Sequence, residues 1–63
     1  MRLLKLKDVI HTTGLARSTI YQYIREGNFP KPISLGIRNS AWLESEIEDW
    51  ILEKIEQRDM AAA

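Results

Sequence analysis

The chain has 63 residues, no cysteine and a formal net charge of zero. A chain of this length forms one small domain, which buries only about 60% of the surface its unfolded state exposes and leaves little room for a catalytic pocket. Without cysteine there is no disulfide framework and no thiolate metal site. No apolar run approaches the roughly 20 residues of a membrane span, and segment 1–9 has too short an apolar stretch for a secretory signal. We therefore expect a cytoplasmic protein that is not an enzyme, with no metal, no cofactor, no small-molecule ligand and no membrane contact.

The zero net charge hides a strong asymmetry between the two parts of the chain. Residues 1–42 hold seven lysines and arginines against two carboxylates, which gives a net charge of +5. Residues 43–63 hold two basic residues against seven carboxylates, which gives a net charge of −5. A basic part of this kind indicates a polyanionic partner such as nucleic acid. The acidic part can equally be a solvent-exposed helix face.

Two short helices are predicted in the basic part of the chain, over residues 6–13 and 17–26. In the first, apolar positions recur at the spacing of one helical face, at Leu6, Val9, Ile10 and Thr13. Gly14 follows, and glycine readily adopts the left-handed conformation that ends a helix. The short connection through residues 14–16 makes the pair a candidate helix-turn-helix.

The second helix is expected to bury Ile20 and Ile24, which lie four residues apart on one face. At about 100° per residue, a group of polar side chains then points away from that face: Ser18, Thr19, Gln22, Arg25 and Glu26. Its N-cap position falls on Ala16, which has no side-chain acceptor for the free amides of the first turn.

A small β-hairpin is predicted after residues 27–32, where one glycine and two prolines end the helix. Its strands are residues 33–35 and 40–42, which alternate apolar and polar side chains, and its turn is 36–39. A last helix is expected to begin near Ser45, because Ser45 and Glu48 have the spacing of a capping box.

The inward face of the last helix is expected to carry Ile47, Trp50 and Ile51, and both Trp42 and Trp50 are expected in the core. The tail, residues 59–63, lacks core residues and is expected to fray, which leaves 1–58 as the domain. The fold class is mainly α with a small β-hairpin: three helices plus a wing.

Several short motifs follow one another in this chain. They are Thr13-Gly14-Leu15, Arg17-Ser18-Thr19-Ile20-Tyr21, Gly27-Asn28-Phe29-Pro30-Lys31-Pro32, Leu35-Gly36, Arg38, and the pair Trp42 and Trp50. This succession, over residues 2–57, resembles the AlpA family of phage and prophage regulators, part of the wider MerR-like winged helix-turn-helix group. Ala16 departs from the serine usual before Arg17 in that family. The resemblance implies sequence-specific binding to double-stranded DNA, control of prophage or integrase genes, and no cofactor.

A short helix in the major groove presents three or four side chains to base edges. Ser18, Thr19 and Gln22 are the candidates here, and the Gln22 amide can bond adenine. The cations beside them, in the hairpin tip and between the two prolines, are candidates for phosphate or a narrow minor groove, as are the tyrosine hydroxyls, although a core position is favoured for Tyr21. The predicted DNA-contacting residues are Arg17, Ser18, Thr19, Tyr21, Gln22, Tyr23, Arg25, Lys31 and Arg38.

Two other functions fit the same sequence. An excisionase-like recombination directionality factor would use the same fold to bend DNA within an integrase complex. A protein-interaction module would use the acidic last helix, where Leu52 and Ile55 lie off the inward face, although single exposed apolar residues are common. A second copy of the chain on DNA is a further candidate partner.

Overall fold

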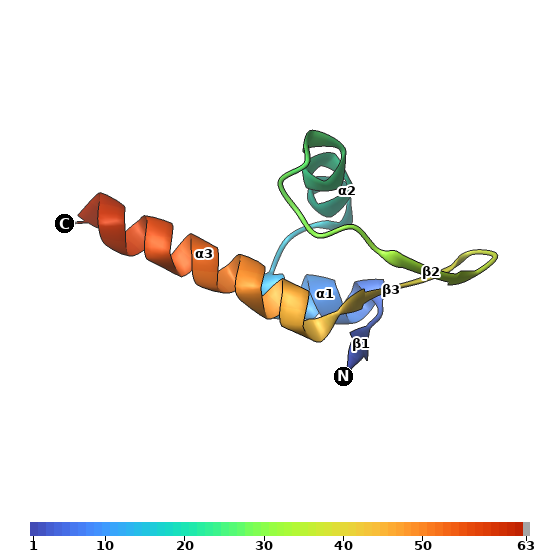
Figure 1. The fold of residues 1–63 in the computed structure, drawn as a ribbon. Coiled ribbons are helices and arrows are strands. Elements are labelled where there is room, and N and C mark those ends of the chain that lie inside the picture. Colours follow the sequence, from blue (N-terminus) through green and yellow to red (C-terminus); the bar gives the residue numbers. More distant parts are fainter. Residues whose placement is uncertain (63) are drawn as a thin grey trace.

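The computed structural model describes residues 1–62 of the chain. They form, in chain order, β1 (Leu3–Leu4), α1 (Leu6–Thr13), α2 (Arg17–Glu26), β2 (Ile33–Gly36), β3 (Asn39–Leu43) and α3 (Glu44–Ala62). This part of the chain is mainly helical with one small antiparallel sheet, which is consistent with a winged helix-turn-helix (Figure 1). The predicted bounds of α1 and α2 are confirmed.

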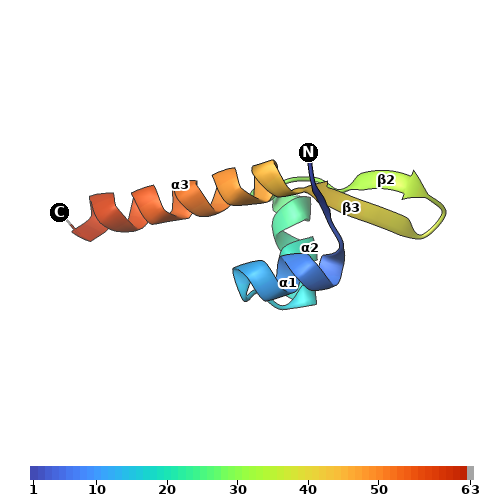
Figure 2. The same ribbon diagram turned by 90° about the horizontal axis from the view of Figure 1, so that it is seen from below.

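The molecule is elongated, with principal extents of 46 × 25 × 19 Å. We call β2, β3 and the turn between them the wing. The wing and α3 extend in opposite directions, and α1 and α2 lie together on one side of the axis they form (Figures 1 and 2). Because β3 runs directly into α3, the wing and α3 diverge from one point beside α1 and α2 (Figures 1 and 2).

The sheet has the order β1-β3-β2, with both neighbouring pairs antiparallel. β2 and β3 are the predicted hairpin, whereas β1 is a strand that sequence analysis did not predict. Its two residues pair Leu3 with Leu43 and Leu4 with Trp42. A strand of this length is too short to show alternation in the sequence, yet it brings Leu4 into the core.

The start of α3 differs from the prediction. The helix begins at Glu44, so Ser45 lies inside its first turn, and the predicted capping box between Ser45 and Glu48 is wrong. The reason is that β3 runs directly into α3, and the Glu44 amide donates to the Arg2 carbonyl oxygen at 2.9 Å. The Glu44 side chain also pairs with the Arg2 guanidinium at 3.2 Å. The neighbouring N-terminal chain thus satisfies the first amide of α3.

The C-terminal half of α3 has few contacts with the rest of the molecule. Among the described residues, none beyond Ile51 packs against the core cluster. The large apolar side chains exposed from residue 52 onward are Leu52, Ile55 and Met60. Residues 59–62, expected to form a frayed tail, lie within the helix, and Ala63 lies outside the described residues. Fraying in solution and a domain boundary at residue 58 stay predictions.

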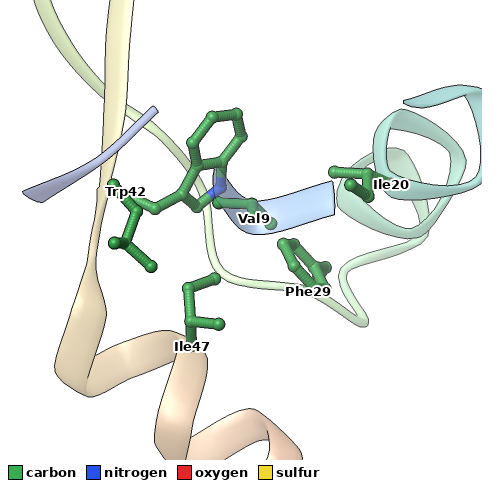
Figure 3. Close-up of a cluster of buried hydrophobic side chains, with 6 residues drawn as sticks. Val9, Ile20, Phe29, Trp42 and Ile47 are labelled. Carbon is green, nitrogen blue, oxygen red and sulfur yellow. The ribbon is translucent and has the colours of Figure 1, made fainter. Parts of the chain in front are cut away.

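The core draws one buried side chain from each part of the fold except β2. These side chains are Leu4, Val9, Ile20, Phe29, Trp42 and Ile47 (Figure 3). Trp42 is the largest of them and is 1% exposed, with its indole Nε1 donating to the Pro30 carbonyl oxygen at 3.0 Å. Because the cluster is so small, each of its members is expected to matter for stability.

Trp50, the other tryptophan expected in the core, is only half-buried. Its ring packs edge-on against Phe29, with 4.9 Å between the centroids. Its indole Nε1 donates to the Asn28 carbonyl oxygen at 2.7 Å, and the Lys54 ammonium lies 5.2 Å from the ring centroid. Trp50 therefore covers the core instead of filling it.

We expect Trp42→Ala to unfold the domain or nearly so. Truncation of a core tryptophan costs roughly 3–5 kcal/mol, while small domains have a total free energy of unfolding near the low end of about 5–15 kcal/mol. Trp50→Ala should cost less, because its ring keeps solvent contact. Thermal and urea unfolding followed by circular dichroism measure both, with exposed Leu52→Ala as the control. A Trp42→Ala midpoint equal to that of the control would show that this core assignment is wrong.

The start of α2 has a local defect that the sequence predicted. Ala16 is the N-cap residue, with φ −71° and ψ 154°, and no side-chain hydrogen bond caps the helix. Its extended backbone is the conformation that a capping serine adopts. By contrast, the end of α2 is well closed, because Gly27 has φ 78° and the Asn28 amide donates to the Tyr23 carbonyl oxygen at 2.8 Å.

Ala16→Ser should stabilise the domain by about 1 kcal/mol, which raises Tm by about 4–8 °C for a chain of this size. The serine oxygen would accept a hydrogen bond from a free amide of the first turn of α2. Ala16→Val is the control, because it enlarges the side chain without supplying an acceptor. Equal Tm values for the serine and valine variants would contradict the capping argument.

Candidate nucleic-acid interface

The outer face of α2 is polar and accessible. Ser18, Gln22 and Arg25 are exposed and Thr19 is half-buried, while Ile20 on the opposite face is fully buried. The helix is held against the core on one side only, so the other side is free to enter a groove. The predicted base-contacting positions thus lie where the helical periodicity places them.

The side chain of Gln22 is not entirely free. Its amide Nε2 donates to Glu26 Oε2 at 3.3 Å, one helical turn away on the exposed face. The bond uses one amide hydrogen and leaves the Gln22 carbonyl oxygen and the other hydrogen available. A bidentate contact with a base edge therefore requires only that this long, solvent-exposed hydrogen bond be exchanged.

One flank of α2 meets the wing. The Arg17 guanidinium lies over the Tyr21 ring, 5.8 Å from its centroid. Arg17 and Tyr21 of α2 join Arg38 and Ser40 of the wing in lining one surface hollow, which we call the α2–wing hollow. Two separate parts of the sequence are thereby brought to a common surface, and Ser40 is a member that sequence analysis missed.

Of the two tyrosines of α2, Tyr23 packs against the core and Tyr21 lies at the surface, which is the reverse of what the sequence favours. Tyr23 packs against the core cluster and lies 6.4 Å from Trp50 between ring centroids, at an interplanar angle of 39°. Tyr21, for which a core position is favoured, instead lines the α2–wing hollow. Tyr23 therefore lies on the flank that faces α3, away from Arg17 and Tyr21 on the wing side.

The wing carries its cation at the tip. Ile33 pairs with Ala41, Ser34 with Ser40 and Gly36 with Asn39, with an irregular register between Ser34 and Gly36. The turn consists of Ile37 and Arg38, and Arg38 has a positive φ of 56°. This places the backbone of Arg38 at the far end of the hairpin, while its exposed side chain also lines the α2–wing hollow.

Two more lysines flank these elements. Lys31 is exposed between Pro30 and Pro32, just before the wing begins. Lys5, which sequence analysis did not select, donates from its ammonium to the Asn39 side-chain oxygen at the wing turn. The sequence feature that could have indicated Lys5 is the group Arg2, Lys5 and Lys7, which precedes the first carboxylate of the chain, Asp8.

The charges of this surface are unpaired. Within residues 1–62, no carboxylate lies within 4.0 Å of the cations predicted to contact DNA, which are Arg17, Arg25, Lys31 and Arg38. The seven carboxylates of the acidic part all lie on α3, which points away from the wing (Figure 2). The −5 part thus extends away from the wing, while Glu46, Asp49 and Glu53 near the start of α3 line a surface hollow together with residues 27–30.

Other chemistry has little support in the described residues. No three His, Asp or Glu side chains within residues 1–62 lie close enough to hold a metal ion. None of the helices in this range combines the length and apolar character needed to cross a bilayer. An apolar surface hollow does lie between the end of α1 and α3, where Thr12 and Thr13 face Ile51 and Ile55.

Comparison with known proteins gives one family and two relatives. Residues 2–55 match the family described as the prophage CP4-57 regulatory protein (AlpA). The chain is 49% identical over 57 residues to the ORF88 protein of Enterobacteria phage P4, a match that covers 90% of this chain and 65% of that protein. It is 37% identical over 60 residues to the DNA-binding transcriptional activator AlpA of Escherichia coli K12, covering 86% of each. The chain thus spans less than two thirds of the length of the phage P4 relative.

Proposed function

Since the chain belongs to the AlpA family of prophage regulatory proteins, we propose that it is a sequence-specific DNA-binding regulator of transcription. We further propose that its fold is a MerR-like winged helix-turn-helix and that its targets include prophage or integrase genes. Double-stranded DNA is the proposed partner, with neither a cofactor nor a catalytic step.

The observation that carries this proposal is the separation of charge in space. The cations of α2 and the wing have no carboxylate partner within 4.0 Å in residues 1–62, and the acidic α3 points away from them (Figure 1). A phosphate backbone can therefore approach α2 and the wing without displacing an internal ion pair. Such a one-sided field steers a protein toward DNA even when its net charge is zero.

Docking follows from the shape of the two elements. α2 enters the major groove, where its exposed Ser18 and Gln22 reach base edges. Arg17 and Tyr21 at the α2–wing hollow then lie over the backbone beside that groove, where a guanidinium and a hydroxyl bind phosphate. The wing continues along the duplex from this point, and Arg38 at its tip reaches the next phosphates or the minor groove. Tyr23, which faces Trp50, contributes through the core and is the weakest of the proposed contacts.

The excisionase-like alternative uses the same surface on a different DNA. A regulator should bind a prophage promoter more tightly than the attachment site, whereas a recombination directionality factor should prefer the attachment site and bend it. Gel shifts and bending assays on the two duplexes separate these functions. A protein-interaction module without DNA binding would show neither preference nor salt dependence on any duplex.

DNA binding should depend steeply on salt in spite of the zero net charge. If Arg17, Arg25, Lys31 and Arg38 each neutralise a phosphate, log K should fall with log salt at a slope of about −3.6. Fluorescence anisotropy with a labelled duplex, titrated over several salt concentrations, measures the slope. A slope near zero would exclude the proposed interface as a whole, and Lys54→Ala on α3 serves as the control variant that should leave the slope unchanged.

Gln22 and Arg38 should contribute in different ways. Gln22→Ala should cost about 1–3 kcal/mol on the preferred site and relax the preference at one base position, because a base contact is lost. Arg38→Ala should weaken binding to all sequences alike and make the salt slope shallower by about one unit, because a phosphate contact is lost. Titrations on the preferred site, obtained by selection from a random library, and on a scrambled duplex measure both effects.

The opposite pattern would reassign the specificity. If Arg38→Ala changed the sequence preference while Gln22→Ala had no effect, the wing would be the reading element, through the width of the minor groove. Glu26→Ala is a useful companion variant, because it releases the Gln22 amide from its hydrogen bond without removing the proposed base contact.

A further inference from the structure

The tip of the wing exposes an isoleucine that neither the core nor the turn requires. Ile37 is 95% exposed and is one of the two turn residues between β2 and β3. Tight turns favour glycine, asparagine, aspartate, serine and proline, each for a conformational reason that isoleucine does not share. The side chain also makes no contribution to the core cluster. Its presence at the tip is therefore unexplained by the free protein.

The second turn residue is also locally unfavourable. Arg38 has φ 56°, in the left-handed region where Cβ meets the following carbonyl and where glycine or asparagine would be more stable. The tip is thus built from a large apolar side chain and a long cation at two successive positions that favour small residues. Local choices that oppose the fold concentrate at functional sites.

The surroundings of Ile37 indicate what covers it. Residues 27–43, which include the whole wing, contain no carboxylate, and the cations near the turn are Arg38 and, through Asn39, Lys5. A second copy of the wing would bring the same positive charge, which opposes self-association through the tips. An apolar point flanked by cations is complementary to a minor groove, where phosphates border the apolar faces of stacked bases. Proteins that kink DNA insert isoleucine, leucine or phenylalanine side chains there.

We propose that Ile37 is an apolar wedge that enters the minor groove and partly unstacks one base step, while Arg38 binds the adjoining phosphate. This rests on the DNA binding proposed above and adds a deformation of the duplex to it. Pyrimidine–purine steps such as TA unstack most easily, so the wedge favours DNA that contains such a step at a fixed distance from the bases read by α2. The wing then contributes sequence preference at a position where it makes no hydrogen bond to a base.

The test uses the whole chain, a duplex of about 20 base pairs of alternating thymine and adenine, and a G·C-rich duplex of the same length. One adenine of a TA step is replaced by 2-aminopurine, whose fluorescence rises when its base unstacks. The wild-type chain should raise this fluorescence on binding and should prefer the A·T duplex. Ile37→Thr, which keeps the branched shape but is polar, should abolish the rise and weaken binding to the A·T duplex by about tenfold.

Leu35→Thr is the matched control, because Leu35 lies on the same wing, is also apolar and exposed, and is away from the tip. It should retain the fluorescence rise, and both variants should keep the wild-type Tm, since neither side chain is buried. If the wild-type chain binds neither duplex at low salt, the proposed function itself is wrong. If it binds with no fluorescence rise and Ile37→Thr binds equally well, the wedge is wrong while DNA binding stands. If the free wild-type chain associates and Ile37→Thr is monomeric in sedimentation, Ile37 is a protein contact and the wedge is overturned.

Discussion

The arrangement of α2 and the wing depends on two indole hydrogen bonds to the segment that joins them. Residues 27–32 form neither helix nor strand. Pro30 and Pro32 also lack the amide hydrogen that a backbone hydrogen bond would need. Trp42 donates to the Pro30 carbonyl oxygen at 3.0 Å, and Trp50 donates to the Asn28 carbonyl oxygen at 2.7 Å. Phe29 between these carbonyls is buried in the core. The connection is therefore fixed at three successive points, and the wing is held at a defined place relative to α2.

This fixed connection explains how a very small core can support a composite surface. Trp42 belongs to β3 and Trp50 to α3, so the sheet and the last helix both hold the same short segment. Trp42 also contributes to the lining of the α2–wing hollow. A shift of the wing would disturb the packing of that ring as well as the hydrogen bond. Rigid support of this kind keeps the spacing between the two elements proposed to contact DNA constant, so that little conformational entropy would be lost on binding.

The sequence predicted α1, α2 and the hairpin because each is encoded locally. Helical periodicity together with Gly14 and Gly27 defines the first two elements, and the structure bears out both boundaries. The unpredicted features depend on contacts between distant segments. β1 exists because Leu4 pairs with Trp42. The start of α3 is set by the Arg2 carbonyl oxygen instead of by a serine.

The candidate site shows the same division. Helical geometry correctly placed Ser18, Gln22 and Arg25 on the exposed face of α2. It favoured the core for Tyr21, which is wrong, because both tyrosines lie on the edges of the buried face and their positions depend on where α3 packs. Tyr23 packs beside Trp50 of α3, whereas Tyr21 lies on the side of α2 that faces the wing. The sequence shows which residues follow Gly36, but only the structure shows that the Ile37 side chain is almost fully exposed to solvent.

Three locally unfavourable choices lie at the start of α2 and in the wing. Ala16 leaves α2 without a side-chain cap, Arg38 occupies a left-handed backbone position, and Ile37 exposes an apolar side chain. All three lie at the start of α2 or at the tip of the wing, the elements that carry the unpaired cations. By contrast, α1 follows the local rules, since the Lys5 amide donates to Asp8 and Gly14 closes the helix. Selection for stability alone would have removed all three with serine, glycine or asparagine, at little structural cost. These choices stand on the same elements as the cations for which we propose phosphate contacts, so a polyanionic partner would account for both.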